Sequence, residues 1–318
     1  MIVITGAAGF IGSQIALRWN NTRNEKLTLV DHAETFLTRG YSYGSAKNIS
    51  ATVDAEEFLT GLKDLADVSM IIHMGAISST AEKNKASLKK WNVDYTKTLW
   101  DFCVQRSIPF VYASSAATYG DGGEGFSDSH EKLKYLKPLN LYGQSKQEFD
   151  LFAVSEKKAP PHWYGLKFFN VYGPHEDHKA RMASSIWHGY QEIMTSSKMT
   201  LFRSHNADYA DGEQARDFIF IADILNIIDF LVKTKPSSGI YNCGTGNPTT
   251  YLELARGLFS ELGKLEKINW IDTPEEFRAG YQYETKSVQD KLRSAGYNLP
   301  ATTLAKGIRK YINYLALK

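Results

Sequence analysis

Short apolar runs alternate with longer amphipathic segments through the first half of the chain. The runs are rich in Ile, Val, Leu and Met on both faces, which is typical of buried strands in a parallel sheet, and the segments between them have helical spacing. We expect strands at Ile2–Thr5, Leu27–Asp31, Met70–Met74, Phe110–Ser114 and Tyr164–Phe169, and helices over Phe10–Asn20, Ala86–Arg106 and Tyr142–Ser155. This alternation predicts an α/β protein with a Rossmann-type, doubly wound parallel sheet.

The second half of the chain is less regular, although strand patterns return at Phe218–Ile221 and Gly239–Asn242. Two lobes that interleave along the sequence would explain this return. The expected division is residues 1–170, completed by segments near 215–245, for the Rossmann domain and residues 171–318 for a smaller α/β lobe.

Composition narrows the classes of partner. The net charge of +2 over 318 residues gives no basic field, so we expect no nucleic-acid partner. Two cysteines, Cys103 and Cys243, are too few for a disulfide framework or a zinc cluster, which indicates a reducing compartment. The sequence has no basic leader and no run of about eighteen apolar residues. We therefore expect a cytoplasmic protein without a membrane partner.

Three glycines follow the first predicted strand and open the first predicted helix. Gly6 would allow a sharp turn, Gly9 would let the backbone approach a phosphate, and Gly12 would permit close packing of helix on strand. Phe10 and Ile11 lie in the first helical turn, where free N–H groups and the helix dipole favour anions. The pattern predicts a site for a dinucleotide pyrophosphate, although a plain glycine turn is the alternative because the spacing departs from the usual one.

Asp31 ends the second predicted strand, where a carboxylate would hold the adenosine ribose hydroxyls, with His32 beside it. A simple capping role at the strand end is the alternative. An aspartate here favours NAD because it repels the 2′-phosphate of NADP, but Arg39 and Lys47 could neutralise that phosphate. The sequence thus leaves NAD and NADP both open.

Small residues follow the third predicted strand. We expect Met74, Gly75, Ala76 and Ser78 to pass beneath the adenine and ribose of the dinucleotide. Asn92, on the next helix, is expected to be a buried polar anchor of this site, and a helix-surface asparagine is the alternative.

Tyr142 and Lys146 are four residues apart, so they share one face of a predicted helix. A tyrosine with a pKa near 10 is a poor base at neutral pH, but a nearby ammonium group stabilises its phenolate. Upstream, Ser115 ends a predicted strand and could bind the reacting oxygen, with Ser114 as the alternative. Glycine loop, serine and Tyr/Lys pair together predict dinucleotide-dependent oxidation of an alcohol.

These motifs make the chain resemble the extended short-chain dehydrogenase/reductase family over nearly its whole length. The segments that carry the resemblance are Tyr112–Gly120, Lys137–Lys146, Phe168–Lys179, Met182–Ser184, Arg216–Phe218 and Gly244–Gly246. The continuation through His178-Lys179 to Met182-Ala183 resembles one branch more narrowly. That branch inverts C6 of ADP-D-glycero-D-manno-heptose to the ADP-L-glycero form, in the synthesis of lipopolysaccharide core precursors.

The resemblance implies a mechanism with tightly bound NADP, NAD remaining possible. C6 is oxidised to a ketone, the sugar reorients, and the hydride returns to the opposite face. Each orientation needs its own acid/base, which the resemblance assigns to Tyr142 and Lys179. Without the resemblance, Lys179 would be read as a solvated loop lysine.

The resemblance also implies the remaining contacts and a homo-oligomer. Val171 and Lys179 would lie at the cofactor. The implied substrate residues are Ser115, Asn170, Arg181, His188, Phe202, Arg203, Ser204, His205, Arg216 and Tyr281. The sequence departs from the family at Met74–Ile77, at Arg181, where a serine is expected, and in a longer loop at Asp208–Gly212.

Three rival functions follow from the same fold. A sugar 4,6-dehydratase would carry an Asp-Glu pair where this chain has Ala116-Ala117. A UDP-hexose 4-epimerase is the nearer rival and would not need Lys179. A non-catalytic dinucleotide sensor would not need the Tyr142/Lys146 pair. We expect no metal, because His175, Glu176 and His178 in a loop are a weak ligand pattern.

Overall fold

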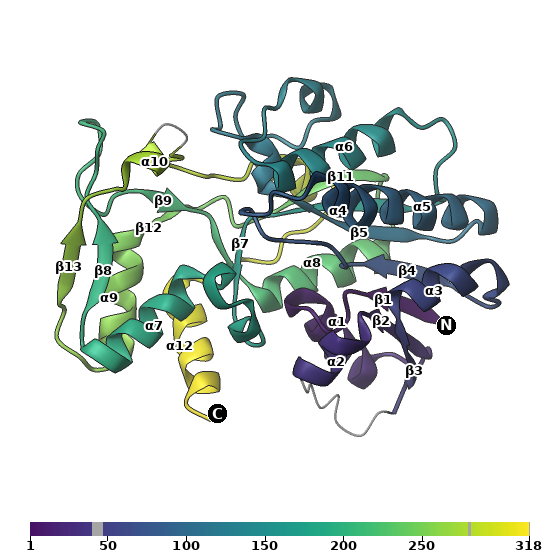
Figure 1. Cartoon of the computed structure of the whole chain (residues 1–318), viewed down its shortest axis with the longest axis horizontal. Coiled ribbons are helices and arrows are strands. Elements are labelled where there is room, and N and C mark those ends of the chain that lie inside the picture. Colours follow the sequence, from purple (N-terminus) through teal and green to yellow (C-terminus); the bar gives the residue numbers. More distant parts are fainter. Residues whose placement is uncertain (40–46, 279–280, 318) are drawn as a thin grey trace. The chain divides into compact units, whose positions relative to one another are not determined.

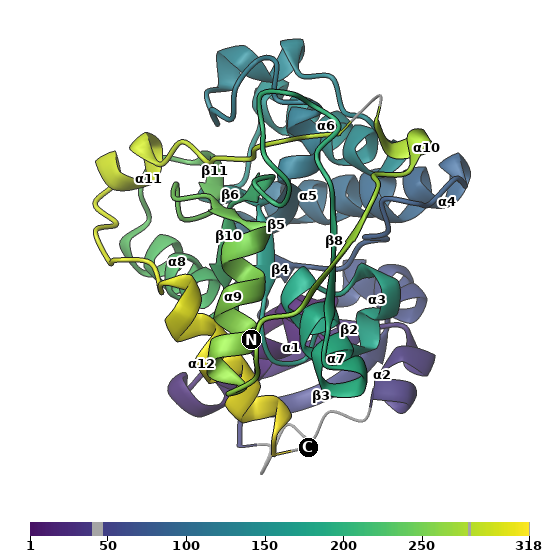
Figure 2. The ribbon, with the colours of Figure 1, turned by 90° about the vertical axis from the view of Figure 1, so that its left-hand side faces the viewer.

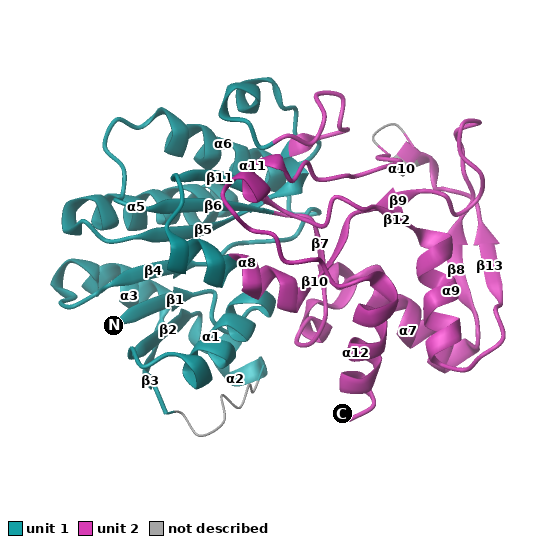
Figure 3. Cartoon of the chain, turned by 180° about the vertical axis from the view of Figure 1, so that it is seen from behind, with its two compact units in different colours: residues 1–118, 128–167, 228–241 teal, residues 119–127, 168–227, 242–318 magenta. Residues whose placement is uncertain are grey.

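The computed structural model describes residues 1–39, 47–278 and 281–317. The chain divides into two compact units, coloured separately in Figure 3. Unit 1 comprises residues 1–118, 128–167 and 228–241, and unit 2 comprises residues 119–127, 168–227 and 242–318. Residues 215–227 lie in unit 2, and residues 228–241 return to unit 1. The division into domains by function stays a prediction.

Unit 1 contains a seven-stranded sheet. The neighbouring strands β3 and β2, β2 and β1, β1 and β4, and β4 and β5 all pair in parallel. Its strand order is β11 (Gly239–Cys243), β6 (Trp163–Phe168), β5 (Phe110–Ser115), β4 (Met70–His73), β1 (Ile2–Thr5), β2 (Leu27–Asp31) and β3 (Ile49–Asp54). The central residues of β1 and β4 are fully buried, and β2 is buried from Leu27 to Val30, which explains why these strands are mainly apolar. The expected Rossmann-type α/β fold is confirmed.

Helices flank this sheet. They are α1 (Phe10–Thr22), α2 (Ala33–Arg39), α3 (Ala55–Gly61), α4 (Lys85–Leu88), α5 (Tyr95–Arg106), α6 (Leu141–Ser155) and α8 (Ile221–Thr234), whose last part belongs to unit 1. Helix α5 packs on β4 and β5, α6 packs on β5, and α1 packs on β1 and β2 (Figure 1). The single helix expected over Ala86–Arg106 is interrupted by a π-helical segment, Lys89–Asp94.

Unit 2 contains three two-stranded sheets, among the residues described. They pair β7 (Asn170–Tyr172) with β10 (Phe218–Phe220), β8 (Met199–Phe202) with β13 (Ile268–Ile271), and β9 (Ala215–Arg216) with β12 (Thr249–Thr250). Its helices are α7 (Ser185–Ser196), α9 (Tyr251–Glu261), α10 (Glu275–Arg278), α11 (Asp290–Ser294) and α12 (Leu304–Leu315). Figure 2 shows α9 and α12 side by side.

Cys103 and Cys243 are both buried free thiols. Within the described ranges, none of the helices is long and apolar enough to cross a bilayer.

Candidate active site

The glycine loop between β1 and α1 is packed too tightly for side chains. Gly6 has a φ of +65°, and a Cβ there would lie 2.5 Å from the backbone nitrogen of Gly75. A Cβ on Gly12 would lie 2.0 Å from the Gly6 carbonyl oxygen. Helix α1 starts after Gly9, which offers no side-chain cap, and Phe10 and Ile11 form its first turn. The loop can therefore bring an anion close to backbone N–H groups.

We expect Gly12→Ala to disrupt this loop, because the new methyl group would overlap the Gly6 carbonyl. The loss of unfolding free energy should be about 1–3 kcal/mol, with weaker binding of NADP(H). Thermal unfolding and fluorescence titration with NADPH measure the two effects. Gly61→Ala is the matched control, because a Cβ at Gly61 would meet no atom within 4 Å. Equal behaviour of the two variants would contradict the role given to Gly12.

Asp31 lies at the end of β2, beside the glycine loop. Its carboxylate accepts hydrogen bonds from the N–H groups of Ala8, at 3.0 Å, and His32, at 2.9 Å. Burial raises the pKa of Asp31, while these hydrogen bonds and the nearby Arg39 charge oppose the rise. Arg39 donates to the Ala8 carbonyl at 2.6 Å. A carboxylate and a guanidinium thus stand together where a dinucleotide ribose is expected, and exposed His32 packs edge-on against Trp91.

Asn92 is buried within the π-helical segment and ties two parts of the site together. Its side-chain oxygen accepts from the Ile77 N–H at 2.8 Å, and its amide donates to the Ile77 carbonyl at 3.0 Å. The same amide donates to the Ser145 hydroxyl on α6 at 2.9 Å. Asn92 is therefore a buried anchor and not a helix-surface residue. It holds the segment from Met74 to Ser78, which includes half-buried Gly75 and Ala76 and exposed Ser78.

Ser115, Tyr142 and Lys146 gather where β5 ends and α6 begins. Helix α6 starts at a defined point because the Asn140 side chain accepts from the Gly143 N–H at 2.8 Å. The Ser115 and Tyr142 side chains are hydrogen-bonded to each other. Lys146 is 4% exposed and donates to the Ala113 carbonyl at 2.9 Å.

Ser114, the alternative to Ser115, faces away from this group. It is buried, and its hydroxyl donates to the Asp150 carboxylate at 2.7 Å. Ser115 is half-buried and lies against Tyr142, so the geometry favours Ser115.

Burial has opposite effects on the two ionisable groups. It raises the pKa of Tyr142, and the Asp150 charge adds to the rise, while the hydrogen bond to Ser115 opposes it. Burial lowers the pKa of Lys146 to about 8, although the Asp150 charge opposes the fall. Tyr142 therefore needs a nearby positive charge to lose its proton at neutral pH, and Lys146, four residues further along α6, is the candidate to supply it.

The segment that carries Lys179 lies in unit 2 and is held by Glu176. The buried Glu176 carboxylate accepts from the Gly173 N–H at 3.1 Å and from the Ser184 N–H and hydroxyl at 2.6 and 2.7 Å. Ala180 has a φ of 45° and a ψ of −119°, a conformation that non-glycine residues rarely adopt. Burial lowers the pKa of Lys179, and the Glu176 charge opposes the fall. Residues so constrained often belong to functional sites.

Aromatic and cationic side chains gather elsewhere in unit 2. The Arg216 guanidinium lies 5.6 Å from the Tyr281 ring centre and 5.7 Å from that of Tyr251. The His205 ring contacts Tyr281 and Tyr283. This cluster could hold a planar base or an anionic group.

The other expected substrate residues differ in their surroundings. Arg203 pairs with the Asp211 carboxylate at 2.8 Å, and the backbone N–H of Ser204 donates to the same carboxylate, also at 2.8 Å. The longer loop thus folds back on these two residues. The remaining substrate candidates are exposed Asn170, Arg181 and His188 and half-buried Phe202, and Val171, which is expected at the cofactor, is also half-buried.

Sequence reasoning missed several residues at these sites. Asp150 and Lys167 form a buried ion pair behind Ser115, and Tyr283 accepts the His205 N–H at 2.9 Å. The sequence suggested Glu176 only as part of a weak metal-ligand pattern, whereas its carboxylate oxygens accept hydrogen bonds from Gly173 and Ser184. The position of Asp150, four residues after Lys146, was a signal that could have been used.

Comparisons with known proteins agree with these features. The profile of the NAD dependent epimerase/dehydratase family matches residues 2–244. The ADP-L-glycero-D-manno-heptose-6-epimerases of Fusobacterium nucleatum and Nitratidesulfovibrio vulgaris are 38% and 40% identical to this chain, over 99% of it and 98% of each relative.

Solved structures extend the comparison to three dimensions. The Helicobacter pylori ADP-L-glycero-D-manno-heptose-6-epimerase is 26% identical, with a TM-score of 0.81, over 100% of this chain and 96% of that one. A UDP-N-acetylglucosamine 4-epimerase from Methanobrevibacter ruminantium, 20% identical with a TM-score of 0.78 over 99% and 98% of the two chains, shares the fold. Similarity that spans sequence, profile and structure confirms the resemblance drawn from the motifs, and the chain belongs to the NAD dependent epimerase/dehydratase family.

Proposed function

We propose that this protein inverts C6 of ADP-D-glycero-D-manno-heptose to give the ADP-L-glycero form, a step toward lipopolysaccharide core precursors. The observation that carries the chemistry is the group of Ser115, Tyr142 and Lys146, which suits the oxidation of an alcohol. The names of the full-length relatives supply the substrate.

A nicotinamide dinucleotide fits the residues present. The crowded glycine loop, the anchored Asp31 carboxylate and Arg39 would hold the pyrophosphate and the adenosine ribose, and Lys146 would hold the nicotinamide ribose. When bound, the nicotinamide supplies a reversible hydride acceptor for C6. We favour NADP because Arg39 offers a positive charge beside Asp31.

Arg39→Ala tests this preference. Loss of the guanidinium should weaken NADPH binding about 10- to 100-fold, the range for a hydrogen bond to a charged group, and leave NADH binding within a few-fold. Fluorescence titration of both cofactors measures the ratio. Lys63→Ala is a control for the loss of one positive charge at another place in unit 1. Equal losses for NADPH and NADH would contradict a 2′-phosphate contact.

The protein's own groups would carry the protons. In one orientation of the sugar, Tyr142 takes the proton of the C6 hydroxyl while the Ser115 hydroxyl bonds the reacting oxygen. The Lys146 ammonium favours the phenolate form of Tyr142. In the other orientation, Lys179 gives or takes the proton, and its lowered pKa suits that role.

The cluster around Arg216 would bind the nucleotide part of the substrate. Arg216 would pair with the diphosphate, and His205 and Tyr281 would contact the nucleotide, with Phe202, Arg203 and Ser204 nearby. Asn170, Arg181 and His188 would contact the sugar or diphosphate, and Val171 would lie at the nicotinamide.

Incubation of the purified protein with ADP-D-glycero-D-manno-heptose and NADP, followed by NMR of C6, tests the function directly. We expect the two C6 epimers to approach equilibrium. No inversion, together with 4-epimerisation of a UDP-hexose, would replace the proposal with the nearer rival. Ala116 and Ala117, at the end of β5, offer no carboxylate for dehydration.

We further propose a homo-oligomer that works in the cytoplasm, where nucleotide sugars and nicotinamide dinucleotides are available. Light scattering coupled to gel filtration tests the first part, since a single 35.8 kDa species at micromolar concentration would contradict it. Cell fractionation with an antibody tests the second.

A further inference from the structure

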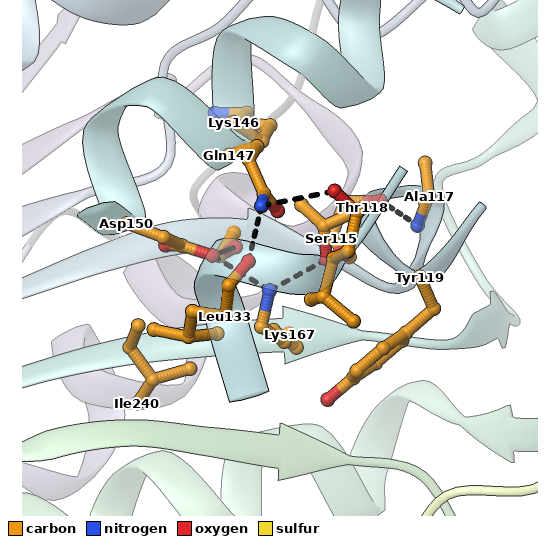
Figure 4. A network of polar contacts seen from close by, with 12 residues as sticks. Ser115, Ala117, Thr118, Tyr119, Leu133, Lys146, Gln147, Asp150, Lys167 and Ile240 are labelled. Atoms are coloured by element: carbon orange, nitrogen blue, oxygen red, sulfur yellow. Dashed lines mark hydrogen bonds and ion pairs between the residues drawn. The ribbon is translucent and has the colours of Figure 1, made fainter. Parts of the chain in front are cut away.

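An ion pair without solvent contact lies behind the Ser115–Tyr142–Lys146 group. Asp150 and Lys167 are each 0% exposed, and the Lys167 ammonium lies 2.7 Å from the Asp150 carboxylate. Figure 4 shows the pair among its polar neighbours. Asp150 also accepts from the Tyr112 hydroxyl at 3.0 Å and from the Ser114 hydroxyl at 2.7 Å. Lys167 donates to the Thr118 hydroxyl at 2.5 Å.

These contacts join the three elements that carry the candidate site. Asp150 lies on α6 one turn after Lys146, Lys167 lies on β6, and Ser114 directly precedes Ser115 on β5. The Thr118 hydroxyl donates in turn to the Ser115 carbonyl at 2.8 Å. The pair therefore holds the serine strand against the tyrosine helix.

A buried ion pair is a costly way to fix a fold. Removing two charges from water offsets most of their attraction, and apolar residues of similar volume often stabilise a protein as well or better. Aromatic rings also lie beside the pair, with Phe149 packed edge-on against Tyr112 at a distance of 4.7 Å between ring centres. Fold stability alone gives little reason for two charges at this place.

The pair is close enough to act on the candidate proton-transfer groups. The Asp150 charge raises the pKa of both Tyr142 and Lys146. From β4, His73 also faces Lys146, but burial lowers the pKa of His73 to about 3, so it is neutral. Tyr112, from β5, faces Asp150 and is uncharged because burial raises its pKa. Among the described residues, Asp150 is thus the charged group that acts on both Tyr142 and Lys146, and Lys167 is the ion-pair partner of its carboxylate.

We propose that Asp150 and Lys167 form a positioning pair that fixes Ser115 against Tyr142 and sets the local charge around Tyr142 and Lys146. The pair touches neither substrate nor cofactor, so it acts through these three residues. The inference rests on the role of Tyr142 and Lys146 in the proposed function, but not on the identity of the sugar.

The pair predicts opposite effects for its two single variants. Asp150→Asn removes the negative charge and leaves Lys167, so the pKa values of Tyr142 and Lys146 should both fall. Lys167→Met leaves the Asp150 carboxylate without its partner, so both pKa values should rise. The expected shifts are about one pH unit each. If the pair had a purely structural role, both single variants would be less stable, but the pKa values of Tyr142 and Lys146 would not shift in opposite directions.

The experiment compares wild type, Asp150→Asn, Lys167→Met and the double variant across pH. NADPH affinity, measured by fluorescence, reports the charge of Lys146, and the pH profile of kcat for C6 inversion reports the coupled Tyr142/Lys146 pair. We expect both readouts to move to lower pH in Asp150→Asn and to higher pH in Lys167→Met. The double variant has no charge at either position of the pair. It should therefore fold, and the pH profiles of its NADPH affinity and kcat should lie near those of the wild type.

Asp229→Asn is the matched control, since it removes a carboxylate of unit 1 that pairs with Arg18 at 2.9 Å and is partly exposed. It should leave both pH dependences unchanged. Shifts of the same sign in the two single variants, or an unshifted affinity profile in all folded variants, would overturn the proposal. If wild type fails to invert the heptose, the proposed function fails, while the affinity profiles still decide the role of the pair.

Discussion

Tyr142→Phe is expected to lower kcat for C6 inversion about 10²- to 10⁴-fold, the usual contribution of a positioned acid/base. The phenylalanine keeps the ring that packs at the start of α6 but cannot take the proton of the C6 hydroxyl. NADPH affinity should change little, because Lys146 and the glycine loop remain. NMR of the epimer ratio in reactions quenched at successive times measures kcat, and fluorescence titration measures the NADPH affinity.

Tyr135→Phe provides the matched control, because it removes the same hydroxyl from a tyrosine that is 54% exposed and is not part of the Ser115–Tyr142–Lys146 group. It should keep wild-type turnover. A Tyr142→Phe enzyme with more than a tenth of wild-type kcat would remove Tyr142 from the mechanism. A loss of turnover that came with a loss of NADPH affinity would instead point to a damaged fold.

Lys179→Met should also abolish most inversion, by about 10²- to 10⁴-fold, yet leave chemistry in the other orientation. Methionine keeps much of the buried side-chain volume but neither gives nor takes a proton. The sugar epimer that is oxidised with Tyr142 as the base should still form the ketone, while the other epimer should not. Trapping the ketone with borodeuteride, starting from each epimer in turn, measures this asymmetry.

Lys198→Met is the control for Lys179→Met, because Lys198 is an exposed lysine of unit 2. Near-normal inversion by Lys179→Met would exclude the two-base mechanism and favour an enzyme that uses Tyr142 alone, as expected for a 4-epimerase. Equal loss of ketone from both epimers would mean that Lys179 supports the fold of its loop instead of one orientation.

The sequence predicted the buried strands of the seven-stranded sheet well, but it did not predict the exposed edge strand of that sheet. Strands β1, β2 and β4 are mainly apolar because helices cover both faces of the sheet. Strand β3 lies at the sheet edge, and its residues from Ser50 to Thr52 are exposed, so no apolar run marks it. The π-helical turn at Lys89–Asp94 also escaped notice, since one extra residue in a turn barely alters a helical pattern.

Site residues on the same helix could be paired from their spacing in the sequence, whereas contacts between residues on different elements could not be predicted. Tyr142 and Lys146 could be paired from their separation alone because both lie on α6. The choice between Ser114 and Ser115 required the structure, in which the Ser114 hydroxyl donates a hydrogen bond to Asp150. The partner of Asp150 lies on β6, and a lysine inside a strand sequence gives no sign that it is fully buried.

The single amide of Asn92 has a wider consequence for redesign. It fastens the segment that is expected to lie beneath the cofactor to the helix that carries Tyr142, through Ile77 on one side and Ser145 on the other. The two ends of the site are therefore linked through one side chain. Exchanging residues 74–78 to alter cofactor preference should therefore also disturb the position of Tyr142 unless the contacts between Ile77 and Asn92 are kept.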